Sequence, residues 1–145
     1  MKVLITGGAG YLGTVLTEEI LNRFPYAKVI VYDNLMYKQD GLFSFFKYPK
    51  DRFEFVYGDV RDKNSLLEQL KKLDKNNDYV IPLAAIVGFP ACARDEKLAT
   101  AVNFEHVKYI VQSTKCRIIY PNTNSGYGVS DGEAHCTEET PLAPI

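Results

Sequence analysis

The sequence predicts an α/β protein built on a doubly wound parallel sheet. Short apolar runs rich in Val and Ile alternate with longer segments in which apolar residues recur at helical spacing. Strands that are apolar almost throughout are buried on both faces, as in a parallel sheet covered by helices. Regular alternation of strands and helices produces right-handed crossovers between such strands. The third observation is a glycine-rich turn directly after the first apolar run.

Length and composition bound the function. The 145 residues have the length of one domain, so we assign residues 1–145 to a single domain. Hydrophobic residues make up 46% and charged residues 24%, as in a folded globular protein, and the net charge of -1 offers no basic surface for nucleic acid or for a membrane. The longest uncharged stretch, 79–93, is shorter than the roughly 18 residues of a spanning helix. Three cysteines without a Cys-x-x-Cys spacing fit reduced thiols, so we expect a cytoplasmic protein.

Five strands are expected, each an apolar run bounded by turn or helix signals. They cover residues 2–6, 28–32, 52–57, 79–83 and 117–120. Helices are expected over 11–24, where Pro25 ends the pattern, and from 96 to about 113. A third helix begins at Asp62 as its N-cap and buries four leucines: Leu66, Leu67, Leu70 and Leu73. The irregular segment 34–50 carries an aromatic cluster expected to cover the sheet edge, and the tail 126–145 is expected to be a surface loop.

The most specific local signal is the motif TGGAGYLG at residues 6–13, between the first strand and the first helix. Gly7 leaves the strand in a tight turn, Gly10 lets the backbone approach a pyrophosphate, and Gly13 allows close packing of helix and strand. The N-terminus of the helix presents free N–H groups to the phosphates. Asp33 ends the second strand, where a carboxylate accepts hydrogen bonds from an adenosine ribose, and no Arg follows at 34–38, so NAD is favoured over NADP. The alternative is a turn that only closes a βα unit, with Asp33 capping a loop.

Other site types are not supported. Thr14 stands where a nucleoside-triphosphate loop needs its Lys, which excludes a kinase or NTPase. His106, His135 and the three cysteines lack the spacing of metal ligands, so no metal site is expected.

Four blocks of sequence, in this order, resemble the extended short-chain dehydrogenase/reductase family of NAD-dependent nucleotide-sugar epimerases and dehydratases. The blocks are TGGAGYLG with the DNL of 33–35, GDVRD at 58–62, PLAA at 82–85, and PNTNSGYG at 121–128 leading into TEETPL at 137–142. The resemblance implies a Rossmann-type fold, NAD as cofactor and a nucleotide-linked sugar as substrate. The cofactor-binding residues are then Gly7, Gly10, Tyr11, Leu12, Gly13, Asp33, Asn34, Asp59, Val60, Leu83, Ala84 and Ala85. Within this set the resemblance gives the adenine to Asp59 and Val60, and the central part of the cofactor to Ala84 and Ala85.

The resemblance also implies one catalytic residue, Thr123, whose hydroxyl binds and polarises the reacting sugar oxygen while hydride passes to the nicotinamide. The alternative is an ordinary hydroxyl at a strand end. Members that dehydrate a sugar carry an Asp-Glu pair directly after this position. Asn124 and Ser125 stand there instead, and neither exchanges protons readily at neutral pH. We therefore expect epimerisation or simple oxidoreduction.

The family's general base is the Tyr of a Tyr-x-x-x-Lys motif, and none of the ten Tyr residues has a Lys four positions later. We expect the chain to end just before this motif and before the substrate domain, leaving the sheet incomplete at its C-terminal side and the 145 residues inactive. The fifth strand would then be an unpaired apolar edge, so we expect self-association into a homo-oligomer. The alternative from another class is a non-catalytic NAD-binding or regulatory module.

Overall fold

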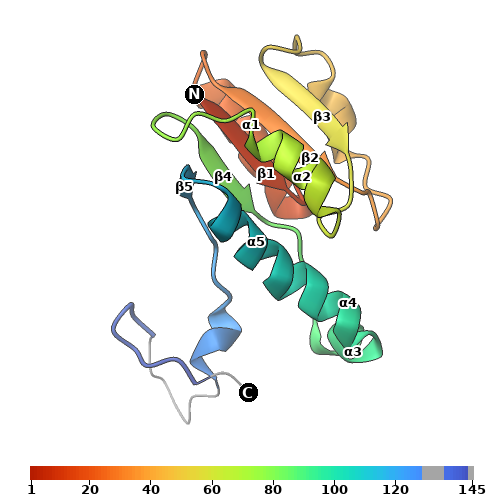
Figure 1. Cartoon of the computed structure of the whole chain (residues 1–145), viewed down its shortest axis with the longest axis vertical. Coiled ribbons are helices and arrows are strands. Elements are labelled where there is room, and N and C mark those ends of the chain that lie inside the picture. Colours follow the sequence, from red (N-terminus) through yellow and green to blue (C-terminus); the bar gives the residue numbers. More distant parts are fainter. Residues whose placement is uncertain (129–135, 144–145) are drawn as a thin grey trace.

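The computed structural model describes residues 1–128 and 136–143, and it confirms the doubly wound parallel sheet (Figure 1). The five strands are β1 (Lys2–Thr6), β2 (Lys28–Asp33), β3 (Phe53–Tyr57), β4 (Tyr79–Pro82) and β5 (Arg117–Ile118). They pair in parallel in the order β3-β2-β1-β4-β5. The winding direction reverses between β1 and β4, and at such a point a doubly wound sheet has a crevice beyond the carboxyl ends of its strands.

Each face of the sheet has its own core. The helices are α1 (Tyr11–Arg23), α2 (Lys63–Leu70), α3 (Phe89–Arg94), α4 (Glu96–Thr100) and α5 (His106–Ser113). Along β1, Val3 and Ile5 pack with residues of α1, whereas Leu4 packs with residues of α2 and α5 on the opposite face. Figure 1 shows α2 and α5 on the same side of the sheet. This two-sided burial is the reason why the strands are apolar at successive positions.

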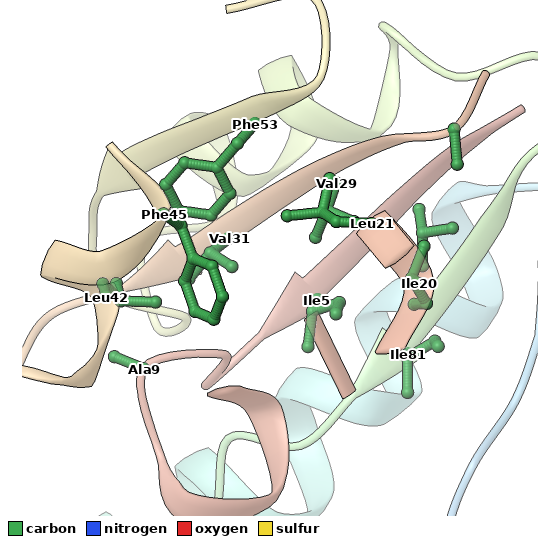
Figure 2. Packing of buried hydrophobic residues seen from close by; sticks show 12 residues of the cluster. Ile5, Ala9, Ile20, Leu21, Val29, Val31, Leu42, Phe45, Phe53 and Ile81 are labelled. Carbon is green, nitrogen blue, oxygen red and sulfur yellow. The ribbon is translucent and has the colours of Figure 1, made fainter. Parts of the chain in front are cut away.

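The aromatic segment forms a short 3₁₀ helix, Gly41–Phe45. Phe45 is buried, and its ring centroid lies 5.5 Å from that of Phe53 on the edge strand β3. Figure 2 shows this pair beside Leu42 and Val31, within the core that also receives α1. Phe45 therefore covers the sheet edge as expected, whereas Phe43 and Phe46 stay largely exposed.

The fifth strand is shorter than predicted. The ladder pairs Val80 with Ile118, and the N–H of Ile119 still donates to the carbonyl of Val80 at 3.0 Å. To continue the ladder in this register, the next hydrogen bonds would need N–H donors at Pro82 and Pro121. Proline has no N–H group, so these hydrogen bonds cannot form. The ladder therefore stops after Ile119 rather than at Tyr120.

The predicted helix over 96–113 is interrupted. Residues Ala101–Glu105 form a π-helical turn between α4 and α5, and such turns are frequent near functional sites. Asn103 lies in this turn and makes two hydrogen bonds to the backbone of Ile86. It accepts from the Ile86 N–H at 2.8 Å and donates to the Ile86 carbonyl at 2.9 Å. Helix α3 was not predicted, because none of its residues is buried and it has no apolar period.

The other element boundaries lie close to the predictions. Asp62 caps α2 by accepting from two backbone N–H groups, as expected. Of the four leucines expected to be buried, Leu67 is only half-buried and Leu73 lies beyond the end of the helix. Of the predicted surface tail, residues 136–143 contain turns and no regular element. Residues 129–135, including His135, and 144–145 lie outside the described residues. In the described part of the chain no helix is both long enough and apolar enough to cross a membrane.

Candidate functional site

A cavity of about 840 Å³ lies beyond the carboxyl ends of the strands, where the winding reverses. Every residue that the sequence predicted for cofactor binding lines this cavity, and so does Thr123. The lining residues from that prediction are Gly7, Gly10, Tyr11, Leu12, Gly13, Asp33, Asn34, Asp59, Val60, Leu83, Ala84, Ala85 and Thr123. The structure thus brings together residues from the ends of all the strands.

Two glycines of the loop are required by packing. Gly7 has a φ of 70°, and a Cβ built on it would lie 2.4 Å from the backbone nitrogen of Ala84. A Cβ on Gly13 would lie 2.5 Å from the Cα of Gly8. Gly7 therefore allows the turn after β1 to touch the loop after β4. Gly13 packs α1 against the glycine loop itself rather than against the strand.

Gly10 differs from these two glycines. Among the described residues, apart from the neighbours of Gly10 in the chain, the only atom within 4 Å of a Cβ built there would be the carbonyl oxygen of Gly7, at 3.3 Å. Gly10 also lines the cavity, so a side chain at this position would extend into it. Packing within the protein does not require a glycine here, whereas a ligand that must approach the backbone closely does.

The N-terminus of α1 opens on the same space. Gly10 is its N-cap, and within the described residues no side chain caps its first turn. The first N–H groups of a helix have no acceptor inside the helix and carry a partial positive charge. Tyr11, Leu12 and Gly13 line the cavity, so this helix end suits an anion such as a pyrophosphate.

Asp33 lies at the end of β2 and is only 8% exposed. Its Oδ2 accepts from the N–H of Ala9 at 3.0 Å, and its Oδ1 accepts from the N–H of Leu35 at 2.7 Å. The sequence left open the alternative that Asp33 only caps a loop. The hydrogen bond from Leu35 is such a cap, so that part of the alternative is correct. A carboxylate has about four acceptor positions, which leaves Asp33 able to receive hydroxyl groups from the cavity as well.

Asp59 receives four hydrogen bonds. Its Oδ1 accepts from the backbone N–H and from Nε of Arg61, both at 2.9 Å. Its Oδ2 accepts from Nη2 of Arg61 at 2.7 Å and from Nδ2 of Asn34 at 3.1 Å. The hydrogen bonds from the Arg61 side chain outweigh burial and lower the pKa of Asp59 to about 2. The carboxylate at this end of the cavity is therefore ionised and fixed in orientation.

The loop after β4 forms the opposite part of the wall. Leu83, Ala84, Ala85 and Ile86 line the cavity. The N–H of Leu83 donates to the carbonyl of Thr6 at 2.8 Å, and Asn103 holds Ile86 from the π-helical turn. Asn103 thus has a structural role in this wall, which it also lines, while Pro82 lines the cavity without a polar side chain to offer.

Thr123 lines the cavity as the N-cap of a 3₁₀ helix, Asn124–Tyr127. Its Oγ1 accepts from the N–H of Ser125 at 3.4 Å and lies 3.0 Å from Oγ of Ser125. When Ser125 is the donor in this hydroxyl pair, the Thr123 proton is free to point at a ligand. The hydroxyl therefore combines a capping role with access to the cavity.

Sequence reasoning missed part of the wall. The additional lining residues include Met36, Tyr37, Gln39, Gly58, Ile86, Val87, Gly88, Val102, Val107, Tyr120, Pro121, Asn122 and Ser125. Most of them lie in loops, which have no hydrophobic period. The rule that ligands bind beyond the carboxyl ends of parallel strands would have found Tyr120 to Asn122, since they follow β5.

A doubly wound sheet, an uncapped helix after a glycine loop and a buried carboxylate at the end of β2 together define a dinucleotide-binding α/β protein. Comparison with known proteins narrows this class. A model of the "NAD dependent epimerase/dehydratase family" matches residues 3–145. The chain belongs to this family, which confirms the predicted resemblance and, for the family, NAD as the cofactor.

Individual relatives agree with this family. The chain is 31% identical over 133 residues to a CDP-paratose 2-epimerase of Salmonella typhi, which covers 88% of this chain and 38% of that protein. It superposes with a TM-score of 0.84 and 28% identity on a dTDP-glucose 4,6-dehydratase of Streptomyces venezuelae solved with NAD, covering 99% of this chain and 46% of that one. For a UDP-glucose 4-epimerase of Thermus thermophilus in complex with NAD, the TM-score is 0.79 at 26% identity, with 99% and 45% covered. The chain thus spans less than half the length of these relatives.

Proposed function

We propose that this chain is the NAD-binding part of an enzyme that modifies a nucleotide-linked sugar by hydride transfer, as an epimerase or a simple oxidoreductase. The observation that carries the proposal is the convergence of the glycine loop, Asp33, Asp59, Ala84 and Thr123 on one cavity. These groups follow or end β1, β2, β3, β4 and β5 respectively.

The residues present fit a dinucleotide lying across the strand ends. The N-terminus of α1 and the open position at Gly10 receive the pyrophosphate. Asp33 accepts the hydroxyls of the adenosine ribose and repels a 2′-phosphate, which favours NAD over NADP. Asp59 and Val60 then lie at the adenine, and Ala84 and Ala85 lie along the central part of the cofactor. NAD supplies the hydride acceptor and donor; the chain binds and orients it.

The chemistry assigned to this chain is that of Thr123. Its hydroxyl, paired with that of Ser125, donates a hydrogen bond to the reacting sugar oxygen. This is the oxygen that becomes a carbonyl oxygen when hydride leaves the carbon that carries it. Asn124 and Ser125 offer no carboxylates for dehydration, which favours epimerisation or oxidoreduction. We assign the proton-accepting Tyr and its Lys to residues outside these 145. The free thiols of Cys92, Cys116 and Cys136 support a cytoplasmic location.

The test of cofactor binding is a titration of the chain with NAD and NADP, followed by calorimetry and by the fluorescence of NADH. We expect NAD to bind with a Kd at or below about 1 mM and NADP to bind at least about tenfold more weakly, because Asp33 faces the 2′ position. Failure of both NAD and NADH to bind at millimolar concentration would contradict the proposal.

A second candidate is a non-catalytic NAD-binding or regulatory module, a function that does not need a Tyr-x-x-x-Lys motif. The intact mass of the protein purified from its native source separates the two. A mass near twice the 16.4 kDa of this chain supports the enzyme, because the additional residues can then contain the general base and the substrate domain. A native mass of 16.4 kDa supports the module.

A further inference from the structure

The carboxylate of Asp59 is held from outside the cavity by a single residue, through two side-chain donors and one backbone donor. Arg61 contributes three of the four donors that Asp59 accepts, at 2.7 to 2.9 Å. Asp59 and Asn34 line the cavity, whereas Arg61 is outside its lining with a half-exposed side chain. Arg61 therefore touches a ligand in the cavity only through Asp59.

The fourth donor is the weakest and the one that a ligand can replace. Nδ2 of Asn34 lies 3.1 Å from Oδ2 of Asp59, and Asn34 is itself on the cavity wall. An amino group of a ligand can take the place of this amide. The guanidinium of Arg61, which donates one hydrogen bond to each carboxylate oxygen like a two-pronged fork, keeps both oxygens in position meanwhile. The carboxylate then presents one acceptor, in a fixed direction, to the base of a dinucleotide.

A fixed, ionised acceptor distinguishes bases by their exocyclic group. Adenine carries an amino group, which donates, at the position where hypoxanthine carries a carbonyl oxygen, which only accepts. An oxygen placed against an ionised carboxylate is repelled, and the carboxylate then gains no hydrogen bond from the exocyclic group of the base. Asp59 lies close to Asp33, the expected ribose acceptor. The N–H of Gly58, the residue before Asp59, donates to the carbonyl of Asp33 at 3.0 Å.

We propose that Arg61 is a positioning residue that acts through Asp59 to make the cavity select adenine over hypoxanthine as the base of its dinucleotide. This inference rests on the proposed binding of NAD and deepens it. It assigns base selection to the ion pair of Arg61 and Asp59, and not to the general shape of the pocket.

The experiment compares the affinities for NAD and for nicotinamide hypoxanthine dinucleotide by calorimetry. Wild type is expected to prefer NAD by about tenfold or more, since hydrogen bonds to charged groups are strong. In the variant Arg61→Ala this preference falls to about threefold or less, because the carboxylate loses its orientation. The matched control is Arg23→Ala, which removes the exposed ion pair of Arg23 with Glu19 on α1 and leaves the preference unchanged. Melting temperatures show that each variant is folded.

The possible results separate the two levels of the proposal. Equal binding of the two dinucleotides by wild type, or an unchanged preference in Arg61→Ala, overturns the role of Arg61 while NAD binding stands. No binding of NAD by wild type overturns the proposed function and this inference with it. If Arg61→Ala does not fold, Arg61→Lys decides the same question. Lysine keeps the charge but not the fork, so the preference must fall by about threefold or more, and an unchanged preference contradicts the inference.

Discussion

The carboxylate of Asp33 ties the glycine loop to the end of β2, because its Oδ2 accepts a hydrogen bond at 3.0 Å from the N–H of Ala9, 24 residues earlier. The other oxygen accepts from the N–H of Leu35 at 2.7 Å. Both oxygens of a nearly buried side chain are therefore engaged by backbone donors. This arrangement makes Asp33 a structural residue of the loop as well as the expected ribose acceptor.

The substitution Asp33→Asn tests this double role. An amide must turn its NH₂ group toward one of the two backbone N–H donors, so we expect the free energy of unfolding to fall by about 1 to 3 kcal/mol. NAD affinity falls by a similar amount in Asp33→Ala, since the charged acceptor is lost. Urea denaturation and calorimetry measure the two effects. Asp51→Asn, at an exposed carboxylate, is the control, and equal stability of the two Asn variants would contradict the bond network.

Gly10 and Gly13 are expected to separate binding from folding. Gly10→Ala places a methyl group in the cavity, so we expect stability within about 1 kcal/mol of wild type and NAD affinity lowered at least about tenfold. Gly13→Ala forces a Cβ to within 2.5 Å of Gly8, and we expect a loss of about 1 to 3 kcal/mol in unfolding free energy. Thermal denaturation and NAD titration of both variants give the comparison. A destabilised Gly10→Ala with normal affinity would refute this division.

The strands and the glycine loop were predictable because their signals are local. An apolar run such as that of β2 is buried on both faces, and the spacing of Gly7, Gly10 and Gly13 follows from a turn and a helix start. Asp33 was predictable because it ends a strand next to that loop. Asp59 and Thr123 were found only through the family resemblance, since nothing in their immediate sequence marks them as parts of one cavity.

The remaining features depend on contacts between distant segments. Helix α3 has no buried residue, so its sequence has no helical spacing of apolar residues from which it could be predicted. The π-helical turn is associated with the contact between Asn103 and the backbone of Ile86, which helical spacing alone does not reveal. The short β5 follows from Pro82 and Pro121, which come to lie at neighbouring positions of the two strands only in the register that pairs β4 with β5. The fork of Arg61 on Asp59 joins residues two apart, but its geometry depends on the loop between them.

His106 makes stability depend on pH. The carbonyl of Val102 accepts from Nδ1 at 3.1 Å, so the neutral ring uses Nε2 to accept from the hydroxyl of Thr6, also at 3.1 Å. Burial lowers the pKa of His106, and both partners are uncharged. The unfolded chain therefore binds more protons than the folded chain between the lowered pKa and the ordinary value of 6.5. We expect stability to be fully present above that value and to fall as the pH drops through this window.

Urea denaturation at about pH 7.5 and about pH 5.5 measures this dependence. The variant His106→Gln is the control, because it lacks the titrating ring while all other groups still titrate. Its unfolding free energy should change less between the two pH values than that of wild type. The same change in both proteins would show that His106 is not responsible.

Asn103 is expected to hold the cavity wall in place. In Asn103→Asp the carboxylate can still accept from the Ile86 N–H, but it cannot donate to the Ile86 carbonyl. We expect a loss of about 1 to 3 kcal/mol in unfolding free energy. Hydrogen exchange should become faster over residues 83–92. Asn76→Asp, at an exposed position, is the control, and unchanged exchange in Asn103→Asp would contradict the structural role.

The outer edge of β5 is expected to drive self-association. In the described residues β5 pairs with β4 alone, and Ile119 and Tyr120 after it are 53% and 54% exposed. An unpaired apolar edge can bind another copy, and a charge placed there opposes such pairing. We expect light scattering to show a mass above 16.4 kDa that rises with concentration, and Ile119→Lys to bring it back toward that value. Phe24→Lys, at a similarly exposed apolar residue directly after α1, should leave the association unchanged. A wild-type protein that stays monomeric from about 1 μM to about 1 mM would show that this edge does not self-associate.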